Sequence, residues 1–405
     1  MPPVLRLPGL PAGVRRFARP VERVGRLTGA LATRAANEVA APGFARRAAR
    51  HAMLPNGAVA VFFATGPENL YQFEQWRRPL EELAGHRPVV VVTDRPDTGA
   101  ELIRQSRLPV TLARGSAALE ELVAERDIRL VLYLNQVEAN FRMLRFAAPV
   151  HIQLGHGESD KASSVSHQHV AYDLTFVGGP AGSERLGAAL RGFDPATRTV
   201  QVGRPQLDHD YPGAPDWPVG SGRRVWYAPT WEGDRPSIAY GSLASHGVAL
   251  VEALLADASV RVVYRPHPRT GTASPAHAAA DRRIRELLRA DRDRHLVDEG
   301  PYGWQWAFAD ACITDVSAVA YDWLGTGKPL AVTQPAQEAY RPVSPLLERL
   351  PLLAAADASD VLARLAVSDP GLAELSRHYF GETADRASTA RFTAAIEQAY
   401  ATTGH

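Results

Sequence analysis

Residues 306–329 read WAFADACITDVSAVAYDWLGTGKP, and this stretch decides how the rest of the chain can fold. An apolar run over 311–314 is long enough for one buried strand. Apolar residues at helical spacing follow from 317 to 324, so the pattern predicts a helix there. A strand that turns directly into a helix is the repeating unit of a parallel α/β sheet. The polar turn from Asp315 to Ser317 should therefore lie at the carboxyl end of a strand, where open α/β sheets bind ligands.

This turn has two interpretations. The free N–H groups and the positive dipole end of a helix suit a phosphate group, and Ser317 could donate to a phosphate oxygen. Asp315 and Ser317 could equally be helix-capping residues, which are common at such positions. The turn alone favours capping, and the choice depends on the sequence around it.

Outward from this stretch, short apolar runs alternate with helical patterns in two sets. The strands predicted in the first set are 58–63, 88–93, 130–134, 150–154, 173–177 and 199–202. The helices predicted there lie near 70–84, 99–106, 116–126 and 181–191. The strands predicted in the second set are 224–227, 260–264, 295–297, 311–314 and 330–333. The helices predicted there lie near 242–256, 276–290, 317–324, 358–366, 370–379 and 384–400.

The alternation predicts the α/β class, with two Rossmann-like, doubly wound domains of parallel strands. Two such domains joined by one linker describe the GT-B architecture, whose cleft lies between them. We expect an Arg-rich helical arm over 1–52, a first domain over 53–205 and a linker rich in Pro, Gly and Asp over 206–222. The second domain should cover 223–405, with its last helix packing back across the junction.

The net charge of +1 hides an asymmetry, because residues 1–52 hold ten Arg and two Glu and carry a charge of +8. Apolar residues are interleaved there at nearly helical spacing. Such an arm can lie on an anionic membrane surface. It can equally be a helical extension that packs on the next domain, and an organelle-targeting peptide has a similar composition.

Several classes of protein and site are not expected. The single cysteine, Cys312, excludes a disulfide framework within one chain and fits a reducing cytoplasm. The sequence shows no apolar run long enough to span a bilayer and no signal-peptide core. His167 and His169 have strand spacing but no obvious further ligands, so no metal is predicted. No basic stripe with interleaved aromatics indicates nucleic acid beyond the arm.

Two histidines follow predicted strands. His156 lies within GHG, at the carboxyl end of a strand, where flanking glycines allow close approach of a backbone. Its unperturbed pKa lies near working pH, so it could take a proton from an attacking hydroxyl group. His267 lies in RPHP over 265–268, where two prolines stiffen the turn and Arg265 offers a planar fork of donors to phosphate oxygens. A structural histidine and a rigid surface turn are the alternatives.

The motifs together resemble the CDP-glycerol glycerophosphotransferase family, which includes the teichoic acid polymerases and primases. YAPTW over 227–231 and RPHP over 265–268 match the family's elements, and 315–329 is similar to its T-D-Y-S-S run that ends in Lys-Pro. GHGESDK over 155–161 resembles the family's W-H-G-T-P-L-K, and GRPQLD over 203–208 resembles G-Y-P-R-x-D. Both lysines of the chain, Lys161 and Lys328, fall on family positions.

The resemblance implies a transferase that moves glycerol phosphate, or a related alcohol phosphate, from a CDP conjugate to a hydroxyl of a cell-envelope glycan or lipid-linked acceptor. CMP is released, the first domain serves the acceptor, and the second holds the nucleotide donor. The expected catalytic residues are His156 and His267. The expected substrate-binding residues are Gly157, Lys161, Thr230, Arg265, Asp315, Ser317, Asp322 and Lys328. No metal or cofactor is expected besides CDP-glycerol as donor substrate.

The resemblance also implies a cytoplasmic protein that is peripheral on the inner face of the membrane, which would suit the arm over 1–52. Related transferases of capsule synthesis share the motifs. Two other classes stay open. One is a GT-B glycosyltransferase or epimerase that uses a UDP- or CMP-sugar. The other is a non-catalytic relative that binds a nucleotide, against which the retained His156 and His267 argue.

Overall fold

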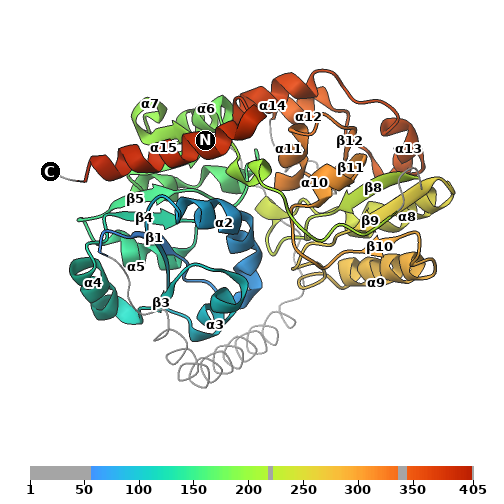
Figure 1. The fold of residues 1–405 in the computed structure, drawn as a ribbon. Helices are drawn as coiled ribbons and strands as arrows, with labels where there is room; N and C mark the ends of the chain where they lie inside the picture. Colours follow the sequence, from blue (N-terminus) through green and yellow to red (C-terminus); the bar gives the residue numbers. More distant parts are fainter. Residues whose placement is uncertain (1–55, 218–221, 336–343, 404–405) are drawn as a thin grey trace, which may run out of the picture.

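The chain forms two parallel β-sheets with helices on their faces (Figure 1). The computed structural model describes residues 56–217, 222–335 and 344–403. The predicted α/β class with Rossmann-like, GT-B-type domains is confirmed. The arm predicted over 1–52 lies outside the described residues.

The first sheet has the strand order β3-β2-β1-β4-β5-β6-β7. Its strands are β1 (Val59–Phe62), β2 (Val89–Thr93), β3 (Val110–Leu112), β4 (Leu130–Tyr133), β5 (Val150–Gln153), β6 (Leu174–Val177) and β7 (Thr199–Gln201). The accompanying helices are α2 (Leu70–Leu83), α3 (Pro96–Gln105), α4 (Gly115–Glu125), α5 (Phe141–Leu144), α6 (Pro180–Ala189) and α7 (Pro195–Arg198). The central strands read as nearly continuous apolar runs because helices cover both faces of a parallel sheet.

The second sheet has the order β10-β9-β8-β11-β12. Its strands are β8 (Arg223–Ala228), β9 (Val260–Tyr264), β10 (Leu296–Val297), β11 (Ala311–Thr314) and β12 (Leu330–Val332). The helices that follow are α8 (Val248–Leu255), α9 (Pro275–Arg289), α10 (Gln305–Phe308), α11 (Ala318–Leu324), α12 (Pro345–Arg349), α13 (Val361–Arg364), α14 (Leu372–Phe380) and α15 (Ala387–Ala401). The stretch 306–329 thus supplies β11, the strand between β8 and β12, and the helix α11 behind it.

The sequence patterns missed the edge strand β3, whose three residues are VTL with only Val110 fully buried. So short a strand leaves no periodic signal. The helix predicted over 242–256 is instead a π-helical turn over Leu243–Gly247 followed by α8. A wider turn shifts the side-chain positions, but the apolar residues around it still read as one helical pattern.

The last helix, α15, lies over the first domain beside α6, although its chain follows the second sheet (Figure 1). Phe392, Ala395, Ile396 and Ala399 are buried in the same core as the first sheet. These positions are spaced three or four residues apart, so they form one apolar stripe along the helix. Tyr400 adds a hydrogen bond from its hydroxyl to the Gly57 carbonyl oxygen, at 2.9 Å.

Candidate active site

A cleft of about 990 Å³ opens between the two sheets and is lined by residues of both domains. On the first domain its walls come from the amino-terminal end of α2 and from the segments that follow β4 and β5. On the second domain they come from the segments that follow β8 and β9 and from the beginning of α11. These are carboxyl ends of parallel strands, as the turn over 315–317 predicted.

His156 lies in the loop that follows β5 and lines this cleft. The preceding Gly155 has a φ of +67°, a conformation that a side chain would strain. Trp76 of α2 donates from its indole N–H to the Gly155 carbonyl oxygen at 2.5 Å. A Cβ atom at Gly157 would lie 2.6 Å from the Ala318 Cβ, so this glycine lets the loop approach the start of α11 closely.

The imidazole of His156 is neutral at pH 7. Burial lowers its pKa to about 4, and the nearby cations Arg204 and Lys161 act in the same direction. A neutral imidazole has a free lone pair and can accept a proton, as a general base must. The ring is therefore in the protonation state that the expected role requires.

His267 follows β9 and reaches the cleft from the second domain. Its Nδ1 accepts a hydrogen bond from the Arg269 backbone N–H at 3.1 Å, so the neutral ring carries its proton on Nε2. Burial lowers its pKa to about 3, and the nearby cations Lys161, Arg269 and Arg265 act in the same direction. A neutral ring with Nε2–H donates a hydrogen bond and suits a phosphate oxygen.

The loop after His267 is held by Glu232, which lies just beyond the YAPTW element. The Glu232 carboxylate accepts backbone N–H groups from Gly271, Ala273 and Ser274 at 2.7–3.0 Å. Trp231 stacks on the His267 ring, with centroids 6.3 Å apart, and on the Arg269 guanidinium. These contacts explain why two sequence elements far apart in the chain act as one structural unit.

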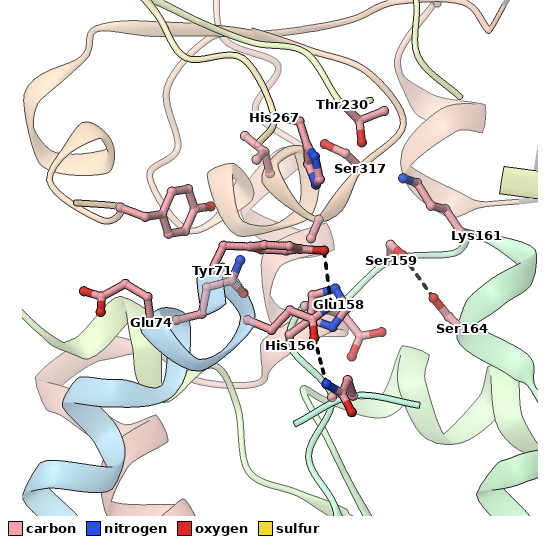
Figure 2. Close-up of a pocket in the computed structure, with 18 of the residues that line it drawn as sticks. Tyr71, Glu74, His156, Glu158, Ser159, Lys161, Ser164, Thr230, His267 and Ser317 are labelled. Carbon is pink, nitrogen blue, oxygen red and sulfur yellow. Dashed lines mark hydrogen bonds between the residues drawn. The ribbon is translucent and has the colours of Figure 1, made fainter. Parts of the chain in front are cut away.

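Tyr71 lies between the two histidines, as Figure 2 shows. Its ring makes edge contacts with His156 at 5.9 Å and with His267 at 5.2 Å between centroids. Burial raises the pKa of its hydroxyl group. The sequence analysis missed this residue because a tyrosine near the start of an amphipathic helix looks like an ordinary packing residue. The available signal was its place in the first turn of α2, the helix that follows β1.

The second domain and the loop after His156 supply the polar groups around the histidines. Lys161, Thr230, Arg265 and Ser317 all line the cleft. Burial lowers the pKa of Lys161 to about 8, although the Asp315 carboxylate opposes this shift. Arg265 donates to Asp298 and to the Gly300 carbonyl oxygen at 2.8 and 2.9 Å. Ser317 precedes α11 but does not cap it, since no hydrogen bond joins its side chain to the helix backbone.

Three of the predicted substrate-binding residues do not line the cleft. Asp315 is fully buried and accepts the backbone N–H groups of Thr230 and Ser242 at 2.7 and 3.2 Å, so it fixes the YAPTW loop. Burial raises the pKa of this carboxyl group. Lys328 donates from Nζ to the carbonyl oxygens of residues 306, 307 and 309 and so stabilises the end of α10.

Asp322, the third of these, forms a buried ion pair with Arg204. The two Arg204 donors reach the two carboxylate oxygens at 2.7 and 3.0 Å. Arg204 ends the first domain and Asp322 lies in α11 of the second, so the pair joins the domains. Arg204 also donates to the His156 carbonyl oxygen at 3.3 Å. The GRPQLD element contained this arginine, but only the structure shows that it supports His156.

Among the described residues, no group of three His, Cys, Asp or Glu side chains could hold a metal ion. In the same part of the chain, no helix is long and apolar enough to cross a membrane.

The sequence profile of the CDP-glycerol:poly(glycerophosphate) glycerophosphotransferases matches residues 196–347. This match confirms the resemblance seen in the motifs. It covers β7 and the whole second sheet, and ends within α12. No curated protein matches the chain by sequence.

Solved structures share the fold. The wall teichoic acid polymerase TagF has a TM-score of 0.57 at 14% identity, over 87% of this chain and 91% of that one. A putative UDP-N-acetylglucosamine 2-epimerase from Listeria monocytogenes has a TM-score of 0.56 at 16% identity, over 86% and 97%. The S. aureus MnaA–UDP structure has 0.56 at 13%, over 84% and 96%. At these identities the likeness concerns the fold alone.

Proposed function

From the match of residues 196–347 to the CDP-glycerol glycerophosphotransferase profile, we propose how the whole site works. The protein transfers glycerol phosphate from CDP-glycerol to a hydroxyl group of a cell-envelope glycan or lipid-linked acceptor. The acceptor oxygen forms a bond to the phosphorus that carries glycerol. The phosphoanhydride bond to the cytidine phosphate breaks, and CMP leaves with the electron pair.

The observation that carries the proposal is the pair of neutral histidines facing one cleft from opposite domains (Figure 2). His156 takes the proton of the acceptor hydroxyl as the new bond forms. His267 donates a hydrogen bond from Nε2 to the donor diphosphate. Placing the two substrates on opposite walls brings the reacting atoms together and removes much of the entropic barrier to their encounter.

The cations beside His267 stabilise the charge that develops as CMP departs. Lys161 reaches across from the first domain, and its Nζ lies 5.1 Å from the centre of the Tyr240 ring in the second domain. Arg265, Arg269 and the Ser317 hydroxyl line the same wall. Donors that are already fixed in place stabilise a transition state without reorganising, which is the largest contribution in many enzymes.

The test is CMP release from CDP-glycerol in the presence of a lipid-linked glycan acceptor. UDP-N-acetylglucosamine serves as the comparison donor, because the epimerases share this fold. We expect CMP release that depends on the acceptor, and no turnover of the UDP-sugar. Turnover of the UDP-sugar alone would move the protein to the sugar-nucleotide class. Binding of CDP-glycerol without turnover of any acceptor would support a non-catalytic relative.

We also propose that the protein acts at the inner face of the membrane through residues 1–52, whose charge is +8. Each basic residue near an anionic surface contributes about 1 kcal/mol at best, which is enough for weak and reversible binding. Sedimentation with anionic liposomes should lose the protein from the pellet when 1–52 are deleted or when salt is raised. Equal sedimentation of both proteins would show that the arm has a structural role only.

A further inference from the structure

A group of uncharged polar side chains lines the deep, first-domain part of the cleft. We name it the amide chamber. It consists of Asn135 and Gln136 after β4, Gln153 at the end of β5, His169, and Thr175 in β6. The chamber lies on the His156 side, since Gln153 precedes that residue by only three positions. None of its members has a role in the donor chemistry described above.

Two amides of the chamber have side-chain atoms without a hydrogen-bond partner. Gln153 is 1% exposed, and neither its Nε2 nor its Oε1 has a partner. Asn135 is 3% exposed; its Nδ2 donates to Gln72 at 2.8 Å, but its Oδ1 is unpartnered. A buried polar group without a partner is costly, so such groups usually meet a ligand or water. Together these two residues offer one donor group and two acceptors at the bottom of the cleft.

The chamber offers hydrogen bonds but no free charge. Burial lowers the pKa of His169 to about 4, so its ring is neutral at pH 7, and its Nδ1 contacts the Thr175 hydroxyl at 3.2 Å. Arg185, a cation on the same wall, is bound by the carboxylates of Glu158 and Asp160. Such a surface suits hydroxyl and amide groups, because the five residues of the chamber carry hydrogen-bond donors and acceptors but no charge at pH 7.

The position of Lys161 adds to the difference in charge between the chamber and the donor side of the cleft. Its ammonium group faces Tyr240 and is attracted by Asp315, both of which belong to the second domain. The cation that the first domain contributes is therefore directed toward the donor side. Arg77, which also lines the cleft, is paired with Glu74 at 2.7 Å.

We propose that the amide chamber is a subsite for an uncharged, polyhydroxylated group, a sugar or polyol, and that Gln153 selects it. As part of the acceptor site this rests on the proposed function, because the bound group would present its hydroxyl to His156. The substrate class is then a neutral glycan end rather than a phosphorylated one.

The experiment measures binding rather than turnover. Methyl β-D-glucopyranoside and its 6-phosphate are titrated against the full chain by NMR. We expect the neutral glycoside to bind at least about tenfold more tightly than its phosphate. We expect Gln153→Leu to weaken glycoside binding by about tenfold, the effect of losing one good hydrogen-bonded contact. Binding of CDP-glycerol should be unchanged in this variant.

Gln206 provides a matched control. It is equally buried, at 1% exposure, and both of its amide atoms also lack partners, but it does not line the cleft. Gln206→Leu should leave glycoside binding unchanged. Both leucine variants remove an unsatisfied buried amide, so each should melt at or above the temperature of the wild type.

The outcomes separate this inference from the proposed function. Three results would each overturn the chamber assignment. The wild type could fail to bind the glycoside, it could bind the 6-phosphate equally well, or Gln153→Leu could bind the glycoside as tightly as the wild type does. Turnover of CDP-glycerol could still be intact in that case. Selective glycoside binding without any CMP release would support the chamber and overturn the proposed transfer reaction.

Discussion

The two walls of the cleft differ in charge and in how clearly the sequence predicts their residues. The second-domain wall gathers His267, Arg265 and Arg269 in one stiff loop, which the Glu232 carboxylate holds in place. The first-domain wall presents His156 and uncharged amides, and its two arginines, Arg77 and Arg185, are paired with carboxylates. A diphosphate needs cations, whereas a hydroxyl nucleophile needs a base and hydrogen bonds. Under the proposed function, the second-domain wall would bind the donor and the first-domain wall the acceptor.

The largest expected effect comes from removing the base of the first-domain wall. His156→Ala should lower kcat by ~10²–10⁴-fold, the range for loss of a general base, while the dissociation constant of CDP-glycerol stays nearly unchanged. His267→Ala should weaken donor binding as well. CMP release and calorimetric titration with CDP-glycerol measure the two quantities separately.

These two variants directly test whether the two walls have different functions. If His156→Ala weakened donor binding as much as His267→Ala does, both histidines would serve the donor and the walls would not be specialised. Since the pKa of His156 is lowered to about 4, kcat/KM should also stay flat between pH 5 and pH 7, because the base remains deprotonated there.

The next largest effect concerns the buried pair that holds the walls together. Asp322→Ala leaves the Arg204 guanidinium buried without its carboxylate, and loss of one partner from a buried pair costs roughly 3–5 kcal/mol of stability. Thermal unfolding measures this loss. Arg204→Met combined with Asp322→Leu removes both charges and should restore most of the stability.

The double variant gives a sharper test of positioning. Arg204 also supports the His156 backbone at its carbonyl oxygen. The double variant should therefore fold well and bind CDP-glycerol, yet keep a lowered kcat. A fully active double variant would show that the pair contributes stability only.

An intermediate effect is expected where the walls touch. Gly157→Ala places a Cβ atom 2.6 Å from the Ala318 Cβ, which is too close for unstrained packing. Overpacking of this kind costs about 1–3 kcal/mol. Ala318→Gly removes the opposing atom, so the combination Gly157→Ala with Ala318→Gly should recover stability and activity. An additive loss in the combined variant would mean that the strain arises elsewhere.

The sequence predicted the parallel sheets well, because β1, β2, β8, β9 and β11 are buried apolar runs bounded by turns. Both histidines that it placed after such runs line the cleft. The sequence did not distinguish residues that line the cleft from residues that support it. Asp315 and Lys328 match family positions, but burial and carbonyl contacts decide their roles.

The first-domain wall was the harder part to predict. Tyr71 and Gln153 reach the cleft only because β1, β4 and β5 are neighbours in the sheet, and strand order is not encoded in local periodicity. The pairing of Arg204 with Asp322 spans 118 positions and joins two domains. Contacts of this kind depend on the tertiary arrangement, for which a single sequence has no pattern.

The smallest expected effect tests whether the charge of Lys161, a first-domain residue, contributes to binding of the donor. Burial lowers the pKa of Lys161 to about 8, so its ammonium is mostly protonated at pH 7 and mostly neutral at pH 9. If this charge holds the diphosphate, affinity for CDP-glycerol should fall by up to about tenfold as pH rises from 7 to 9. The diphosphate diester does not titrate in that range, and the pKa values of both histidines lie far below it.

Two variants serve as controls. Lys161→Arg keeps its charge at pH 9 and should abolish the decline, whereas Lys161→Met should bind CDP-glycerol weakly and equally at both pH values. A wild-type affinity that stays constant from pH 7 to 9 would assign donor binding to the second-domain wall alone and make the division between the walls complete.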